Sequence, residues 1–183
     1  MAARETIRPL PSAPQRQAAA CVGSSGGDDS DADLLRHAAQ GNAAAFEKIA
    51  CRYDQAILSL LLALTGSERV ALDLCHSTLL CAYREMQRRR APSMYIWFYR
   101  LAADQWLAWA GKQARQPQDA PLRASTPADV LGTLSARESL VFALKSNQRL
   151  ALPTVAQIVD LPPETVARIF TRAVAKLRLS LRP

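Results

Sequence analysis

The sequence predicts an all-α fold of two small helical domains joined by a flexible linker. Helix-capping residues recur before segments whose apolar residues are spaced three or four apart. Alternating strand patterns are absent, and a proline-containing stretch with no helical period separates the two helical regions. We expect a disordered tail at 1–30, a first domain at 31–112, a linker at 113–133 and a second domain at 134–183.

Composition and charge indicate a globular protein with a basic C-terminal part. The chain has 183 residues, of which 49% are hydrophobic and 21% charged, and its net charge is +7. Residues 134–183 carry eight basic and three acidic groups, a difference of +5. This region is therefore where a polyanion such as DNA is expected to bind, with a solvated basic face as the alternative.

Neither the cysteines nor the apolar runs indicate a metal site or a membrane span. The four cysteines form no CxxC pair, and Cys75, His76 and Cys81 lack the spacing of a tetrahedral site. Free buried thiols are typical of a reducing cytosol. The longest apolar run, 56–64, is too short to cross a bilayer. We predict no bound metal, no membrane span and a cytoplasmic location.

Four helices are expected in the first domain. Each follows a capping residue, and the caps are Ser30, Asn42, Ser67 and Ser93. The first helix should run to Gln40, the second should end at Gly66, and the fourth should end near Gly111. The third helix should bury one face, formed by Ala71, Leu74, Thr78 and Ala82.

The fourth predicted helix, within 93–110, holds six of the chain's eleven aromatic residues. It follows the cationic run Arg88-Arg89-Arg90. Rings beside cations suit a platform for unstacked bases, whereas an aromatic-rich helix is also typical of a packed core. Both interpretations stay open from the pattern alone.

The second domain has the pattern of a helix-turn-helix. Ser135 and Glu138 form a capping box before its first helix. A short helix is predicted from Thr154 to Asp160, and Pro162-Pro163 then forces a turn into the last helix.

Cations recur on the last predicted helix. Arg168, Arg172 and Lys176 are four residues apart, drifting by about 80° around the axis. Such a line suits phosphate contacts, and Thr165 with Arg168 lies near the helix N-terminus, where base edges are read. The alternative is a solvated helix whose cations suit its C-terminal end.

Several segments together resemble the extracytoplasmic-function (ECF) sigma factors. Residues 134–144, 155–159, 164–166 and 172–178 are similar to sigma region 4 of that family. Sigma region 2 is similar to 41–49 with Arg52-Tyr53, to 71–84, and to Trp97-Phe-Tyr-Arg-Leu-Ala. The resemblance covers 31–112 and 134–183, in the family's order.

The resemblance implies a transcription factor with no active site and no cofactor. Its partners would be core RNA polymerase, promoter DNA and an inhibitory anti-sigma factor. Docking on the polymerase β′ coiled coil would use Asp73, His76 and Arg84. The −10 promoter element would meet Tyr95, Tyr99 and Arg100. The −35 element would meet the last helix, through Thr165, Arg168, Arg172 and Lys176.

Two departures from the family pattern leave a second function open. His76-Ser77 stands where the family has an acid, and Ala103-Asp104 stands where it tends to Arg-Asn. An acid beside DNA is repulsive. The alternative is therefore a sigma-derived regulator, binding DNA or protein without opening promoters. An enzyme is disfavoured, because the chain has two histidines and no Gly-rich phosphate loop.

Overall fold

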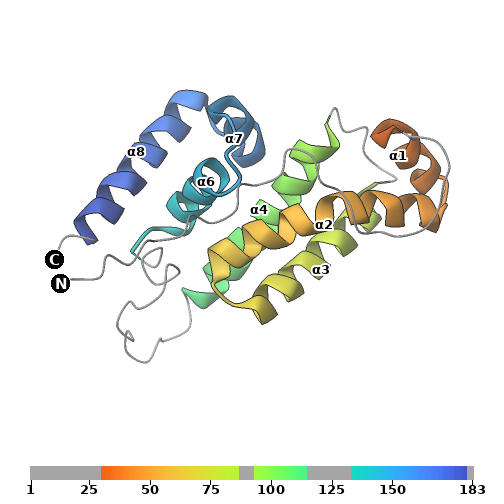
Figure 1. Ribbon diagram of the computed structural model, residues 1–183, viewed down its shortest axis with the longest axis horizontal. Helices are drawn as coiled ribbons and strands as arrows, with labels where there is room; N and C mark the ends of the chain where they lie inside the picture. The colour runs from red at the N-terminus through yellow and green to blue at the C-terminus, as the bar shows by residue number, and fades with distance from the viewer. Residues whose placement is uncertain (1–29, 87–92, 115–132, 181–183) are drawn as a thin grey trace, which may run out of the picture.

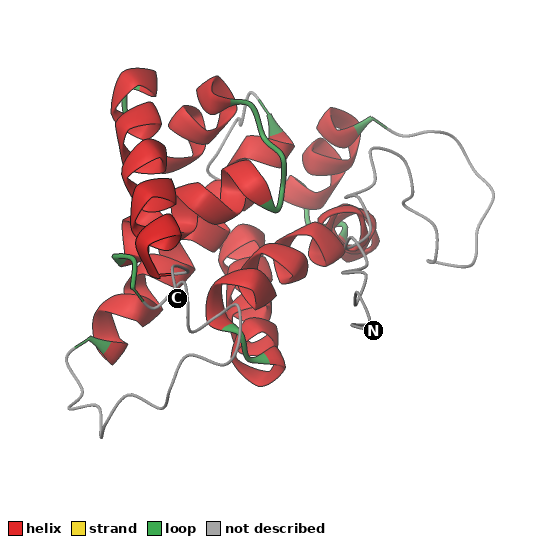
Figure 2. Cartoon of the chain, turned by 60° about the vertical axis from the view of Figure 1, so that its left-hand side comes forward, coloured by secondary structure: helices red, strands yellow, loops and turns green. Residues whose placement is uncertain are grey.

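A computed structural model of the chain describes residues 30–86, 93–114 and 133–180. Within these ranges every regular element is a helix and there is no strand (Figures 1 and 2). The helices are α1 (Asp31–Ala39), α2 (Ala43–Thr65), α3 (Glu68–Glu85), α4 (Met94–Gln113), α6 (Ala136–Ser146), α7 (Leu152–Val159) and α8 (Pro163–Ser180). The all-α prediction is confirmed. The predicted tail and most of the predicted linker lie outside the described residues.

The starts of α1, α2 and α4 follow the predicted caps. The side chains of Ser30, Asn42 and Ser93 accept hydrogen bonds from the backbone N–H three residues on, at 3.2, 3.2 and 3.5 Å. At the end of α2, Gly66 adopts the left-handed conformation with φ 63°, which a glycine reaches without a steric penalty. Helix α4 continues past Gly111 to Gln113, because a single glycine within a helix does not terminate it.

The first four helices pack around a core that α2, α3 and α4 share. The predicted inward face of α3 is buried, with Ala71, Thr78 and Ala82 at 0% exposure. Trp97 and Phe98 of α4 enter the same core, at 4% and 0% exposure. Tyr53 of α2 stacks on Phe98, with ring centroids 4.9 Å apart.

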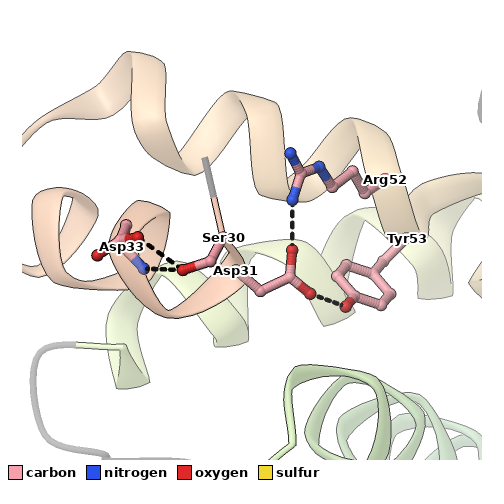
Figure 3. Close-up of polar contacts among 5 residues, drawn as sticks. All are labelled: Ser30, Asp31, Asp33, Arg52 and Tyr53. Carbon is pink, nitrogen blue, oxygen red and sulfur yellow. Dashed lines mark hydrogen bonds and ion pairs between the residues drawn. The ribbon is translucent and has the colours of Figure 1, made fainter. Parts of the chain in front are cut away.

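Helix α1 is tied to α2 by one carboxylate. Asp31 accepts hydrogen bonds from the guanidinium of Arg52, at 2.5 Å, and from the hydroxyl of Tyr53 (Figure 3). Burial, followed by the Asp31 hydrogen bond and charge, raises the pKa of Tyr53 above its usual range. The tyrosine therefore remains a hydrogen-bond donor at physiological pH.

Helices α7 and α8 follow each other across a short turn, at the place where the sequence predicts a helix-turn-helix. Ser135 and Glu138 make both hydrogen bonds of the capping box, at 2.9 and 3.3 Å. Helix α7 starts at Leu152, two residues before the predicted Thr154, since a proline in the first turn lacks only an N–H that would have no partner there. The turn between α7 and α8 contains Asp160, in the left-handed conformation with φ 55°.

Helix α6 packs against α2 and α4, α7 packs against α4, and α8 packs on α6 and α7. Figure 1 shows α8 at one end of the long axis and α1 at the other, with α6 between α8 and the α2–α4 layer. One apolar cluster runs from Leu34 of α1 to Val166 of α8 without a break between the two groups of helices. The core of the first group thus continues into the C-terminal group.

Candidate nucleic-acid interface

Helix α8 presents a cationic face to solvent. Its inward stripe is Val166, Ala173 and Leu177, and these side chains are at most 8% exposed. Arg168 and Arg172 lie on the opposite, exposed face, together with Arg178, which the four-residue spacing did not predict. Scoring every cation on the polar arc of this helix, rather than one line of spacing, would have found it.

At the start of α8, the two residues that are predicted to contact base edges, Thr165 and Arg168, lie side by side. The guanidinium of Arg168 donates to the hydroxyl of Thr165 at 3.3 Å. Arg168 is exposed and Thr165 is half-buried. Both stand in the first two turns of α8. In the helix-turn-helix that the sequence predicts, this part of the second helix contacts base edges.

Further along α8, the predicted line of cations turns toward α6. The ammonium of Lys176 contacts the carboxylate of Glu138 at 2.7 Å, and the guanidinium of Arg172 lies 3.4 Å from the same carboxylate. The drift of about 80° over the two four-residue steps from Arg168 carries Lys176 to the edge of the buried stripe. Lys176 therefore serves in an internal ion pair, while Arg172 keeps 74% of its side chain exposed.

Glu138 of α6 is the carboxylate that both of these cations of α8 contact. It is 6% exposed, and it accepts from Ser135 as well as from Lys176. The hydrogen bond from Lys176 holds the pKa of this carboxyl below its usual range, against the opposing effect of burial. Glu138 is thus an anion at physiological pH.

Two of the α4 side chains that are predicted to contact DNA, Tyr99 and Arg100, contact the C-terminal part of the chain instead. Tyr99 is 1% exposed, and its hydroxyl lies 2.8 Å from the side-chain oxygen of Gln148, in the turn after α6. Arg100 is paired with Asp160, in the turn after α7, at 2.9 Å. Tyr95 is half-buried, with its ring centroid 4.5 Å from that of Tyr99. No local pattern predicts Gln148 as the partner of Tyr99 or Asp160 as the partner of Arg100, because the members of each pair are roughly fifty residues or more apart.

The tryptophans of α4 lie in two different environments, one in the core and the other at the contact with α6. Trp97 packs in the core, and its buried indole N–H has no partner among the described residues. Trp106 is 6% exposed, and its indole N–H donates to the carbonyl of Ala136 at the start of α6. Trp109 lies beside Trp106, with centroids 5.3 Å apart. Arg88, Arg89 and Arg90 lie outside the described residues.

On α3, the side chains predicted for polymerase docking are exposed: Asp73, His76 and Arg84. Exposed apolar side chains surround them, at Leu72, Leu80 and Tyr83. Between α2 and α3 a shallow pocket is lined in part by Leu58, Leu72, His76 and Leu79. A mixed apolar and polar surface of this kind is typical of a protein interface.

Two other kinds of site are not found in the described ranges. No group of three or more His, Cys, Asp or Glu side chains is placed there to hold a metal ion. No helix in 30–86, 93–114 or 133–180 combines the length and apolar character of a membrane span.

Neither a protein-family model nor a curated protein sequence matches the chain. Solved structures do. CnrH, in complex with the cytosolic domain of CnrY, is 22% identical with a TM-score of 0.65, covering 82% of this chain and 96% of that one. The sigma factor RpoE, in complex with the anti-sigma factor NepR from Bartonella quintana, is 16% identical with a TM-score of 0.59, covering 75% of this chain and 98% of that one. The chain therefore has the fold of these proteins.

Proposed function

We propose that the protein is a sigma factor of the ECF type, which binds core RNA polymerase and directs it to promoters. The main support for this proposal is the exposed, cationic start of α8, where Arg168 lies beside Thr165. It lies in a helix-turn-helix, behind a helical bundle, in a fold shared with the sigma factor RpoE. A sigma factor performs no chemistry of its own, so we propose no enzymatic activity, and we place the protein in the cytoplasm with the polymerase.

Each surface has a role in this proposal. The exposed side of α3, with Asp73, His76 and Arg84, docks on the β′ coiled coil. Helix α4 meets the −10 element through Tyr95, Tyr99 and Arg100. Helix α8 reads the −35 element, with Thr165 and Arg168 toward base edges and Arg172 toward phosphate. We assign Lys176 a supporting part, since it holds Glu138 at 2.7 Å.

An anti-sigma factor is the proposed inhibitory partner. The solved relative RpoE is in complex with the anti-sigma factor NepR, and CnrH with the cytosolic domain of CnrY. The apolar side chains exposed on α2 and α3, Leu62, Leu72, Leu80 and Tyr83, provide a surface for such a protein.

Transcription in vitro tests the proposal. Core polymerase with the protein should yield discrete transcripts from genomic DNA fragments of the native cell. Arg168→Ala should reduce them by about tenfold, the usual size of a lost base-edge contact. Lys145→Ala, on α6, is the matched control for loss of one cation. No specific transcript from any fragment would refute the proposal.

The second candidate function is a sigma-derived regulator that does not open promoters. It is favoured by Asp104, an exposed acid one turn after Arg100 on α4. An acid there repels DNA phosphates. If this charge is the obstacle, Asp104→Asn should increase promoter opening, measured by permanganate reactivity of unpaired thymines. An unchanged permanganate signal would count against that explanation.

A further inference from the structure

We propose that Glu164 and Arg168 together set the base preference of α8. Glu164 accepts a hydrogen bond from the amino group of a cytosine, and Arg168 donates to a guanine one or two base pairs away. The assignment rests on the proposed function, in which α8 enters the major groove of the −35 element. It adds a residue that the spacing of cations did not indicate, because Glu164 is an acid.

Glu164 and Arg168 are the residues in the first two turns of α8 that point farthest from the core. At about 100° per residue, each lies about 20° from the direction opposite the inward stripe of this helix. Both side chains are exposed. Thr165, in contrast, lies about 80° from that direction and is half-buried. The outermost pair at the start of α8 is therefore an acid and a cation.

The outward face of α8 is open to a ligand. In the described ranges α8 packs on α6 and α7, and it lies at one end of the long axis (Figure 1). Within the same ranges, no hydrogen bond or ion pair engages the carboxylate of Glu164. This carboxylate can therefore accept hydrogen bonds from a ligand.

The donor that suits Glu164 in the major groove is the amino group of cytosine. Phosphates repel a carboxylate, so an acid is unfavourable on a DNA-binding face unless it contacts a base edge. Guanine and thymine present acceptors in the major groove, and adenine presents an acceptor, N7, beside its amino group. Cytosine presents the amino group N4, which is the usual partner of Glu. The acid at position 164 therefore favours cytosine.

Arg168 suits a guanine near this cytosine. Its guanidinium donates to the hydroxyl of Thr165 at 3.3 Å, so Thr165 positions it. A guanidinium has five N–H donors, and a bidentate contact with O6 and N7 of guanine uses two of them. Glu164 and Arg168 are about 6 Å apart along the helix axis, against about 3.4 Å per base pair along DNA. The two contacts therefore fall one or two base pairs apart.

Farther along the same face, the side chains present methyl groups. The hydroxyl of Thr171 donates to the carbonyl of Ala167 at 2.9 Å, and position 175 is an alanine. Such side chains make apolar contacts, as with the methyl group of thymine. Hydrogen-bonded readout by the outward face is therefore concentrated at Glu164 and Arg168.

Glu164→Gln tests the assignment, because glutamine keeps the length of the side chain and pairs with N6 and N7 of adenine. The matched control is Glu68→Gln, since Glu68 is likewise an exposed acid in a first helical turn, on α3. An acid in a first turn also stabilises its helix, and both variants lose that effect. Far-UV circular dichroism checks that both keep their helices.

Selection from duplex DNA with a randomised central segment is the first readout. The full-length chain is used alone and with core polymerase, at one salt concentration. The wild type and Glu68→Gln should enrich a cytosine and a guanine one or two base pairs apart. Glu164→Gln should enrich an adenine in place of that cytosine and keep the guanine. A wild-type pool without this pair, or an unchanged cytosine in the Glu164→Gln pool, overturns the assignment.

The second readout is the anisotropy of two fluorescein-labelled duplexes, the selected one and its version with adenine in place of the cytosine. The wild type should bind the cytosine duplex on the order of tenfold more tightly, and Glu164→Gln should reverse the order. If Glu164→Gln binds both duplexes more tightly by one factor, the acid only repels phosphates and the assignment fails. That result leaves the proposed function standing. If the wild type enriches no sequence under either condition, the proposed function fails with the assignment.

Discussion

At the scale of single residues, Glu138 shows how one buried carboxylate serves two purposes. It caps α6 through Ser135, and it holds the cation of Lys176 from α8. A carboxylate at 6% exposure needs such partners, because an unpaired buried charge is costly. The ion pair therefore ties the C-terminal half of α8 to the start of α6.

Lys176→Met should lower the free energy of unfolding by about 1–3 kcal/mol, since methionine keeps most of the stem and removes the ammonium that faces Glu138. Urea unfolding followed by circular dichroism measures this. Arg178→Met, at an exposed position on the same helix, is the control and should change stability by less than about 0.5 kcal/mol. Equal losses in the two variants would contradict a structural role for Lys176.

The pH dependence of stability follows from the same carboxylate. The folded-state pKa of Glu138 is lowered, chiefly by Lys176, so its stabilisation is complete above the ordinary Glu pKa of about 4.3. That stabilisation is lost as the pH falls through the lower folded-state value. The stability difference between wild type and Glu138→Gln should therefore shrink as the pH is lowered from about 6 to about 3.

Urea unfolding at a series of pH values tests the sign and the cause of this dependence. Because Lys176 is the largest cause, the Lys176→Met background should show a weaker pH dependence of the same difference. A difference that grows toward low pH would contradict the assignment.

At the scale of elements, α1 is attached to the bundle by the carboxylate of Asp31 and by apolar side chains. Asp31 accepts hydrogen bonds from Arg52 and Tyr53 of α2 (Figure 3). Tyr53 in turn stacks on Phe98 of α4. A helix of nine residues is too short to be stable alone. Its order therefore depends on Leu34, which is buried, and on this contact.

Asp31→Ala should loosen α1 and lower stability by about 1–2 kcal/mol, because the guanidinium and the hydroxyl lose their acceptor. Hydrogen exchange of the amides of 31–39 should accelerate by about tenfold. Asp33→Ala is the matched control, since Asp33 lies in the same turn and pairs with Arg36 within α1. If both variants had the same effect, the charge at the helix N-terminus would explain it, and the contact to α2 would not.

At the scale of the whole molecule, the two groups of helices share one core. Trp106 joins the two groups, because it is buried on α4 and its indole N–H donates to the carbonyl of Ala136 at the start of α6. A shared core couples the unfolding of the two groups, whereas two helical groups joined only by a linker would unfold separately.

Calorimetry should therefore show one main unfolding transition for the wild type and two for Trp106→Ala. Truncating a buried tryptophan removes about 3–5 kcal/mol, taken here largely from the contact between the groups. Trp109→Ala, at a half-buried position, should keep the single transition. Two transitions in the wild type would refute the shared core.

Much of the helical architecture could be predicted from the sequence because its signals are local. Ser30, Asn42 and Ser93 cap the helices that they were expected to cap, and the capping box of Ser135 and Glu138 forms as predicted. The start of α7 was placed two residues late, since Pro153 is tolerated in a first helical turn.

The site residues were harder to predict. The spacing of residues gives their direction around the helix axis, but it does not say which other element lies in that direction. Asp73, His76, Arg84 and Arg168 lie on exposed faces, and their predicted roles stay predictions. Tyr99, Arg100 and Lys176 are engaged by residues far away in the chain. The domain boundaries also stay predictions, since 115–132 lies outside the described residues.

The sequence alone was enough to predict the helices and their inward stripes, because caps and apolar periods act within a few residues. Which polar side chains stay exposed to solvent depended on the tertiary packing. It set Gln148 against Tyr99, Asp160 against Arg100 and Glu138 against Lys176. These pairings depend on how α6, α7 and α8 lie on one another and on α4, and the packing of apolar surfaces over the whole chain sets that arrangement.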